Sequence, residues 1–289
     1  MRRGKWAALW LLAAVACGAP SAPANRGPAR VITLLPNLTE IVVALGAGNR
    51  IVGCTSYCPR ASLAAEVADM GTPLSPSLER IAALRPDLVL MQDTQHEARD
   101  RLRAMGLRAE DVPAVSFADV FTAVRRIAEL LGLDRAGVEL AERIRSELAG
   151  VAARIRGRPP VRTLVVIGHD RGALRQIFLA GPDSFITNLL VTAGGENVLP
   201  KSPIPYPVVG VEEILKLNPE AVLVLAPDEE DTPAAQERER RLWSALSYLN
   251  AVKNGRVYLL ADRDILTPGP RMGETAARFA RLLHPEATP

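Results

Sequence analysis

Residues 78–90 read LERIAALRPDLVL, and residues 211–223 read VEEILKLNPEAVL, at a constant offset of 133 residues (211 minus 78). Each copy has an acidic residue in its second position, apolar residues at helical spacing, a proline, and an acidic residue that enters a short apolar run. This order predicts a helix followed by a buried strand in both copies. A unit that recurs in this way predicts two similar α/β lobes in one chain.

Strand and helix signals alternate around the first copy of this unit. Ser77 is placed to cap a helix over 78–84, and a further helix is expected over 97–105. Alternation of this kind favours a parallel sheet. The expected strands of this half lie at 31–35, 51–53, 87–91 and 114–115.

The longest helical signal lies between Asp134 and Arg156, where apolar residues recur every three or four positions among arginines and glutamates. Some twenty residues at about 1.5 Å each give a rod of about 30 Å, long enough to connect two lobes. Pro159 and Pro160 end the pattern. A coiled coil is the alternative, but its three heptads are few and strand signals lie on both sides.

We therefore expect an α/β fold with two Rossmann-like lobes. An N-terminal lobe of 30–133 and a C-terminal lobe of 159–289, each with a central parallel sheet, are joined by a rigid helix over 134–158. Open α/β sheets bind ligands at the carboxyl ends of their strands. The ligand cleft is thus expected between the two lobes.

The first residues of the chain have the pattern of a secretory signal. Three basic residues precede an uncharged apolar run over 6–16, which ends in small residues before Cys17. Eleven apolar residues are too few to span a bilayer of about 30 Å as a helix. We expect a signal peptide over 1–16 and a proline-rich tether over 17–29 that is lipidated at Cys17, with ordinary cleavage nearby as the alternative.

The composition fits an exported globular protein. The chain has 289 residues, 48% of them hydrophobic and 23% charged, with a net charge of +3. Removal of residues 1–16 takes away three positive charges and leaves a net charge of zero, so the charge does not indicate a nucleic-acid partner. No later stretch has 18 uncharged apolar residues, so contact with the membrane is expected only through the lipid anchor.

Several stretches together resemble the helical-backbone class of bacterial periplasmic substrate-binding proteins. They are RVITLLPNLTE at 30–40, LERI at 78–81, PDLV at 86–89 and GGENV at 194–198. This class serves ABC importers of cobalamin, ferric siderophores, haem and some metals. The sequence is most similar to cobalamin-binding proteins, which carry a similar aromatic-proline pair, here Tyr206-Pro207. The resemblance implies a periplasmic, monomeric receptor that delivers cobalamin or a similar corrinoid to a permease dimer with its ATPase. The alternatives are a ferric siderophore, haem or a bare metal ion.

The resemblance also implies a docking role for one acidic residue on each lobe. In such receptors these acids contact arginines of the permease, and the matching positions are Glu79 and Glu212. The internal repeat places the same two residues at equivalent positions without the resemblance. Matched charges on two lobes suit a two-fold symmetric partner. The alternative is that each acid only complements the N-terminus of its own helix.

The candidate ligand-binding residues are Tyr57, Tyr206, Arg271 and His169. The tyrosines lie in proline-bounded loops where the family's cleft residues fall, and aromatic rings suit the apolar faces of a planar corrin or haem. Arg271 falls where the family places a cleft arginine, whose forked donors suit a carboxylate or phosphate. His169 ends the first strand of the second lobe.

No resident metal or cofactor is expected. The chain has three histidines, none in a short paired spacing. His96 and His169 follow strands of different lobes and could meet across the cleft with a carboxylate, whereas His284 is expected at the surface. Cys54 and Cys58 are four residues apart in an exported chain, so a disulfide, free buried thiols and metal-binding thiols are all open.

The sequence predicts a receptor, with a periplasmic α/β enzyme as the rival class. It contains no Gly-x-Ser-x-Gly, no phosphate-binding Gly-x-x-x-x-Gly-Lys and no Gly-x-Gly-x-x-Gly motif. Two α/β lobes with a cleft can also carry catalysis, so the fold alone does not decide.

Overall fold

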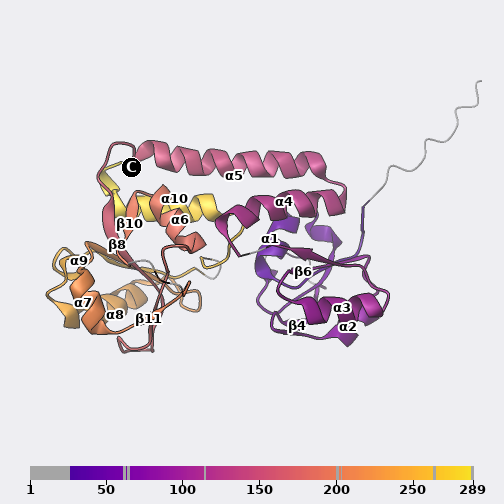
Figure 1. Cartoon of the computed structure of the whole chain (residues 1–289), viewed down its shortest axis with the longest axis horizontal. Coiled ribbons are helices and arrows are strands. Elements are labelled where there is room, and N and C mark those ends of the chain that lie inside the picture. Colours follow the sequence, from indigo (N-terminus) through magenta and orange to yellow (C-terminus); the bar gives the residue numbers. More distant parts are fainter. Residues whose placement is uncertain are drawn as a thin grey trace, which may run out of the picture.

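The protein has two lobes that lie side by side beneath one long helix, α5 (Asp134–Arg154) (Figure 1). The computed structural model describes residues 27–60, 63, 66–113, 115–199, 202, 204–262 and 265–287. The predicted signal peptide, Cys17 and most of the predicted tether lie outside these residues. Among the described helices, none is both long and apolar enough to cross a membrane.

The N-terminal lobe contains a five-stranded parallel sheet in the order β3-β2-β1-β6-β7. Alternate residues of its central strands pack on opposite faces, as Val31 and Ile32 do in two separate core clusters. Its strands are β1 (Val31–Thr33), β2 (Ile51–Cys54), β3 (Ala68–Asp69), β6 (Leu88–Gln92) and β7 (Ala109–Val112). A separate hairpin consists of β4 (Gly71–Thr72) and β5 (Ser75–Pro76).

Helices cover both faces of this sheet. Ile41 of α1 and Ile127 of α4 pack on one face in a cluster that continues into α5, whereas Ile81 of α2 and Leu102 of α3 pack on the other. The helices of this lobe are α1 (Pro36–Ala44), the 3-10 helix η1 (Gly48–Arg50), α2 (Leu78–Ala83), α3 (His96–Ala104) and α4 (Phe117–Leu131).

The C-terminal lobe contains a mixed sheet in the order β11-β9-β8-β12-β13, with β10 also paired to β8. The expected parallel arrangement holds for β8, β12 and β13, but β9 is antiparallel to β8 and β11 to β9. The reversal arises because the chain folds back tightly after β8, where Asp170 N–H donates to the Arg175 carbonyl at 2.9 Å. The strands are β8 (Val161–Gly168), β9 (Ile177–Leu179), β10 (Gly195–Asn197), β11 (Val208–Val209), β12 (Ala221–Leu225) and β13 (Val257–Leu260).

The helices of the C-terminal lobe also divide between two faces. Leu190 of α6 and Phe279 of α10 join the cluster that contains α5, so one core runs beneath α5 through both lobes. Ile214 of α7 and Trp243 of α8 belong to a second cluster on the other face. The helices are α6 (Phe185–Thr192), α7 (Val211–Leu217), α8 (Pro233–Trp243), α9 (Asn250–Lys253), α10 (Met272–Leu283), and the 3-10 helices η3 (Ser244–Leu246) and η4 (Pro285–Ala287).

The internal repeat forms the same structure twice, as α2 with β6 and as α7 with β12. Before each proline, a residue with positive φ ends the helix, Arg85 at 44° and Asn218 at 40°. The acid that enters each strand accepts a backbone N–H from the start of the neighbouring strand. Asp87 accepts from Arg30 at 2.8 Å, and Glu220 accepts from Arg162 at 3.0 Å.

The same two arginines also bond to the end of the repeated helix through their side chains. The Arg30 guanidinium donates to the Leu84 carbonyl at 2.7 Å, and the Arg162 guanidinium donates to the Leu217 carbonyl at 2.8 Å. Both carbonyls belong to the last turn of a helix, where backbone acceptors have no partner within the helix. An arginine at the start of β1 or β8 therefore ties the repeated helix to the sheet in each lobe.

Two expectations about element boundaries were wrong. The strand predicted near 114–115 lies earlier, at Ala109–Val112, because Glu110 and Asp111 mask its apolar pattern, and Ala114 lies outside the described residues. The connecting helix ends at Arg154, where Ile155 leaves helical geometry ahead of Gly157 at φ 79°.

Candidate ligand-binding site

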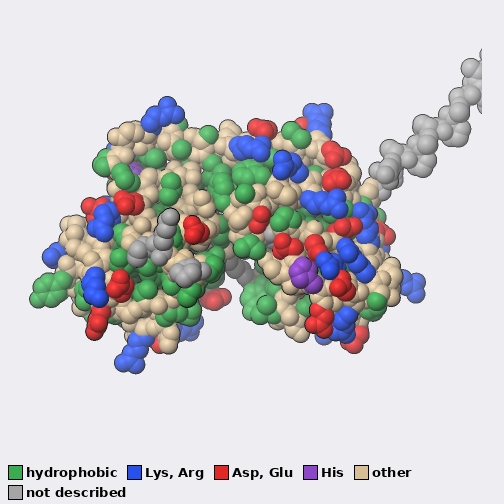
Figure 2. Space-filling view, in the orientation of Figure 1, with side chains coloured by type: hydrophobic (Ala, Val, Ile, Leu, Met, Phe, Trp, Pro, Cys, Tyr) green, Lys and Arg blue, Asp and Glu red, His purple; other side chains and the backbone are tan. Residues whose placement is uncertain are grey.

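Segments that follow strands of both lobes meet at the junction between the lobes. Glu40 is the middle residue of α1, the helix that follows β1, and its carboxylate is 3.4 Å from the guanidinium of Arg271. Arg271 belongs to the segment that follows the last residue of β13, Leu260. This contact joins the segments after β1 and β13, and so lies at the junction of the two lobes. Figure 2 shows an open groove between the lobes on the side away from α5.

Tyr57 lies beyond the carboxyl end of a strand of the N-terminal sheet. It is in the loop that follows β2, and 58% of its surface is exposed. By contrast, Cys54 before it and Cys58 after it are fully buried. The loop is held by the Cys58 N–H, which donates to the Thr55 carbonyl at 3.1 Å. An exposed aromatic ring on a buried support is suited to contact the face of a ligand.

Tyr206 belongs to an exposed apolar patch on the C-terminal side, which we call the edge patch (Phe178, Tyr206, Val208). Phe178 and Val208 are paired across β9 and β11, and Phe178 is level with Gly168, the last residue of β8. Tyr206 is two residues before Val208, in the bend that precedes β11. These side chains are 41–48% exposed, and partial burial raises the pKa of the Tyr206 phenol. Figure 2 shows hydrophobic side chains gathered on this lobe beside the groove.

Arg271 is held by acidic residues of both lobes. Besides Glu40, it lies 3.9 Å from Asp262, which in turn accepts a hydrogen bond from Arg278 at 2.8 Å. The Glu40 side chain is 9% exposed and that of Arg271 is 42% exposed. The structure therefore gives Arg271 an interlobe contact, and its predicted role in ligand binding stays a prediction.

Asp93 is a candidate that the sequence did not single out. It follows the last residue of β6, Gln92, at the groove edge of the N-terminal sheet. One carboxylate oxygen of Asp93 is buried and has no hydrogen-bond partner within the described part of the chain. Buried polar atoms are normally paired, so this oxygen is an unusual feature at the end of β6.

His169 lies at the end of β8, where it is tied into the protein. Its Nδ1 is 2.8 Å from the Asp170 carbonyl, and its Nε2 is 3.0 Å from the carboxylate of Glu239, which also accepts from Trp243 Nε1 at 2.8 Å. The bond to Glu239 raises the pKa of the His169 imidazole despite the opposing effect of burial. Both ring nitrogens lie beside oxygen acceptors of the protein, so neither is directed at a metal ion.

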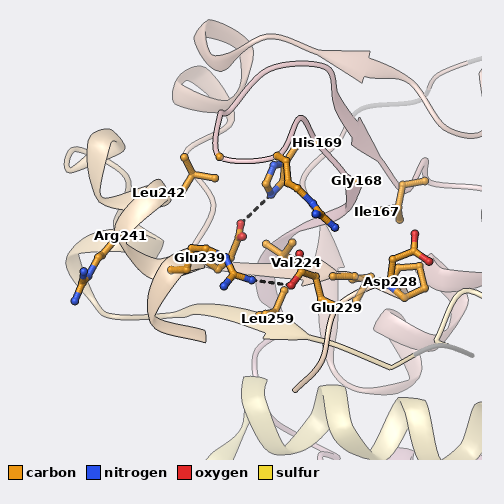
Figure 3. Close-up of a pocket in the computed structure, with 16 residues that line it drawn as sticks. Ile167, Gly168, His169, Val224, Asp228, Glu229, Glu239, Arg241, Leu242 and Leu259 are labelled. Carbon is orange, nitrogen blue, oxygen red and sulfur yellow. Dashed lines mark hydrogen bonds and ion pairs between the residues drawn. The ribbon is translucent and has the colours of Figure 1, made fainter. Parts of the chain in front are cut away.

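A pocket of about 490 Å³ surrounds this pair (Figure 3). It lies entirely in the C-terminal lobe, between the ends of β8 and β12, the following loops, α8 and Leu259 of β13. His169 thus lines this pocket, and its role in binding the transported ligand remains a prediction.

No three-residue metal site occurs among the described histidines, cysteines and acids. His96 is exposed at the start of α3, and it does not meet His169. His284 was expected at the surface, but it is 4% exposed because its Nε2 bonds to the Gly194 carbonyl at 3.0 Å.

Cys54 and Cys58 are free thiols in the structure, so the disulfide alternative is not formed there. The Cys54 thiol donates to the Cys58 sulfur, which lowers the pKa of Cys58 to about 6 and raises that of Cys54. The Cys58 sulfur also accepts from Thr39 Oγ1 at 3.1 Å and lies 3.4 Å from Thr55 Oγ1. These bonds fix the support beneath Tyr57.

Glu79 and Glu212 occupy equivalent places in the two lobes. Each is the second residue of its helix, α2 or α7, and each is exposed. Ser77 caps α2 by accepting from the Arg80 N–H, as predicted, whereas Gly210 precedes α7 without a side-chain cap. The two helices lie toward opposite ends of the long axis of the molecule (Figure 1).

Residues 31–263 match the sequence pattern of the family described as periplasmic binding protein. The chain belongs to this family. Among the relatives of this periplasmic binding protein is the vitamin B12-binding protein of Salmonella choleraesuis (strain SC-B67), 31% identical over 197 residues, which are 68% of this chain and 71% of the relative. Another is the uncharacterized ABC transporter substrate-binding lipoprotein YvrC of Bacillus subtilis (strain 168), 27% identical over 91% of this chain and 82% of the relative.

Solved structures agree with the fold of this periplasmic binding protein. A periplasmic haem-binding protein from Pseudomonas aeruginosa has a TM-score of 0.76 and 25% identity, over 91% of this chain and 95% of that chain. The periplasmic vitamin B12-binding protein BtuF of Vibrio cholerae has a TM-score of 0.72 and 22% identity, over 90% and 98%. The expected α/β class and the predicted family are confirmed.

Proposed function

We propose that this protein is the extracytoplasmic substrate-binding component of an ABC importer and that it captures cobalamin or a similar corrinoid in the interlobe groove. The observation that supports the proposal is the exposure of two aromatic rings, Tyr57 in the loop after β2 of one lobe and Tyr206 in the edge patch of the other. A flat macrocycle with two broad apolar faces matches two such walls.

Polar groups at the rim add a second element to the fit. A corrinoid carries amide groups around its ring, and the Asp93 carboxylate, one oxygen of which is unpaired in the described part of the chain, can accept an amide N–H when its side chain turns outward. Asp93 lies at the carboxyl end of β6, so it and Tyr57 belong to the same edge of the N-terminal sheet. Both the vitamin B12-binding relatives and the aromatic walls support a corrinoid, while haem and ferric siderophores are competing ligands.

Delivery to the permease depends on the acids at the two ends of the molecule. Glu79 and Glu212 would each contact a basic residue on one subunit of a permease dimer, since the repeat places them equivalently. Lipidation at Cys17 would hold the receptor at the membrane through the tether. The ATPase that drives transport is then a partner of the permease and not of this chain.

The proposal is tested by native mass spectrometry and absorption spectroscopy of the protein incubated separately with cobalamin, haem and a ferric siderophore. We expect one cobalamin per chain, released unchanged. Tyr57→Ala and Tyr206→Ala should each weaken binding about tenfold or more, because each removes one aromatic wall. Asp93→Ala should also weaken binding.

Tyr248→Ala is the matched control, because this tyrosine is 81% exposed in the loop before α9. Its loss should leave cobalamin affinity unchanged. Binding of haem or siderophore in preference to cobalamin would overturn the corrinoid assignment. Chemical turnover of any of these ligands would overturn the receptor function.

A further inference from the structure

The pocket around His169 has features of a binding site separate from the groove. It has a volume of about 490 Å³, within the range of small-molecule pockets and small for a corrinoid. Its floor is apolar and includes Ile167, Val224, Leu242 and Leu259. A floor of this kind favours an apolar ligand body.

The charges inside the pocket already neutralise one another. His169 pairs with Glu239 at 3.0 Å, and Arg238 pairs with Glu229 at 2.6 Å (Figure 3). Arg241 pairs with Glu237 and points away from the centre of the pocket. These pairs shape the walls but leave little net charge to attract an ion.

Two opposite charges on the rim remain. Arg171 comes from the hairpin after β8, and Asp228 comes from the loop after β12. Both residues are exposed, and neither side chain has a hydrogen bond or ion pair within the described part of the chain. The pocket therefore offers one cation and one anion from two different elements above an apolar floor.

We propose that this pocket binds a small zwitterion with an apolar body, the chemistry of an apolar amino acid or short peptide. Arg171 would bind the carboxylate of the ligand through its forked donors, and Asp228 would bind the ammonium group. The apolar side chain would cover Val224 and Leu259 on the floor. This inference goes beyond the proposed function and does not depend on it.

The pocket lies at the carboxyl end of the C-terminal sheet, and two residues of its floor face away from the edge patch. Val224 and Leu259 belong to the core cluster that includes Ile177 and Leu179 of β9. Phe178 lies between these two residues and points to the opposite face, where the edge patch is exposed. A ligand in the pocket and a ligand against the edge patch would thus contact different faces of one sheet.

The test uses the dipeptide leucyl-phenylalanine with isothermal calorimetry and the fluorescence of Trp243, which is fully buried and donates to Glu239. Trp243 is the only tryptophan beyond residues 1–16. We expect saturable binding at one site with a change in Trp243 emission. The N-acetylated dipeptide and the C-terminal amide should each bind about tenfold more weakly, since each loses one charged contact.

Arg171→Gln and Asp228→Asn should have complementary effects. Arg171→Gln should weaken binding of the free dipeptide about tenfold but should leave the affinity for the C-terminal amide unchanged. Asp228→Asn should also weaken binding of the free dipeptide about tenfold but should leave the affinity for the N-acetylated dipeptide unchanged. Arg175→Gln and Glu230→Gln are the matched controls, because both residues are exposed neighbours that do not line the pocket.

Three results would overturn the proposal. The first is absence of dipeptide binding, and the second is binding that survives in both variants. The third is a tenfold loss of cobalamin affinity in Arg171→Gln and Asp228→Asn, which would make the pocket part of the groove. Failure of cobalamin binding in the unaltered protein would concern the proposed function and would leave the dipeptide result standing.

Discussion

The Arg271 guanidinium lies 3.4 Å from the Glu40 carboxylate, and this ion pair connects the two lobes directly. The Glu40 side chain is almost completely buried, so it depends on its partners for compensation of its charge. Gly269 lies against the same carboxylate, where an added Cβ would be 2.5 Å from Glu40 Oε2. The contact therefore sets how closely the C-terminal segment approaches α1.

Loss of the arginine should destabilise the protein. We expect Arg271→Gln to lower the free energy of unfolding by about 1–2 kcal/mol, a value reduced from that of a fully buried pair because Arg271 is partly exposed. Urea denaturation measures this difference. Arg135→Gln is the control, because the Arg135 side chain is 93% exposed in its pair with Glu139 and its loss should change stability by less than about 0.5 kcal/mol. Equal stability of Arg271→Gln and the unaltered protein would contradict the role of the pair.

The pair of His169 and Glu239 should make stability depend on pH. The folded protein has a raised His169 pKa, so the stabilisation is fully present below the unfolded value of about 6.5 and is lost as pH rises through the folded pKa. Unfolding free energies measured from pH 6 upward should therefore decline more steeply in the unaltered protein than in Glu239→Gln. His169→Asn, which cannot titrate, should also lack this component. Parallel pH profiles for all three proteins would show that the pair makes no such contribution.

The thiol pair beneath Tyr57 offers a second titration. Because the Cys54 thiol donates to Cys58, thiolate absorbance in the folded protein should appear with its midpoint at a pH of about 6. Cys54→Ala removes this donor and should move the midpoint to higher pH. Thr55→Ala is a weaker perturbation of the same sulfur and should shift it less. An unchanged midpoint in Cys54→Ala would argue that Thr39 and Thr55 alone stabilise the thiolate.

Much of the fold follows from local sequence patterns, because the repeated helix and strand have their stabilising contacts close in sequence or at the same offset. Ser77 is three residues from Arg80, whose backbone N–H donates to it, and the burial of β6 is visible in its continuous apolar run. By contrast, β7 carries Glu110 and Asp111, which are paired with Arg126 and Arg99 from other elements. Such a strand is recognised only once those partners are known.

The site was predictable to the same limited extent. Tyr57 and Tyr206 could be proposed from their proline-bounded loops, but Phe178 joins them only through the antiparallel pairing of β9, which no local pattern indicated. His169 was singled out at its strand end, yet its partner Glu239 is 70 residues away on α8. Pairings over such distances depend on how the elements pack, and for this reason the pocket itself was not predicted.

The matched acids give a prediction about transport. Charge reversal in Glu79→Arg with Glu212→Arg should abolish stimulation of the transporter ATPase while leaving cobalamin affinity intact, because both residues are exposed on α2 and α7 and outside the groove walls. ATPase activity of the reconstituted transporter and ligand binding are measured on the same preparations. Glu142→Arg, on the exposed surface of α5, is the control and should stimulate normally. Loss of cobalamin binding in the double variant would instead place these acids at the ligand.

The long helix limits how far the lobes can move. Buried residues of α5, among them Ile144 and Leu148, pack in the cluster that runs through both lobes, so closure on a ligand must distort this core. We expect small-angle scattering to give nearly the same radius of gyration with and without cobalamin. Ala149→Pro should break α5 at an exposed position in its second half and increase the difference, whereas Ala149→Ser should not. A change of several ångströms in the unaltered protein would mean that the lobes hinge despite α5.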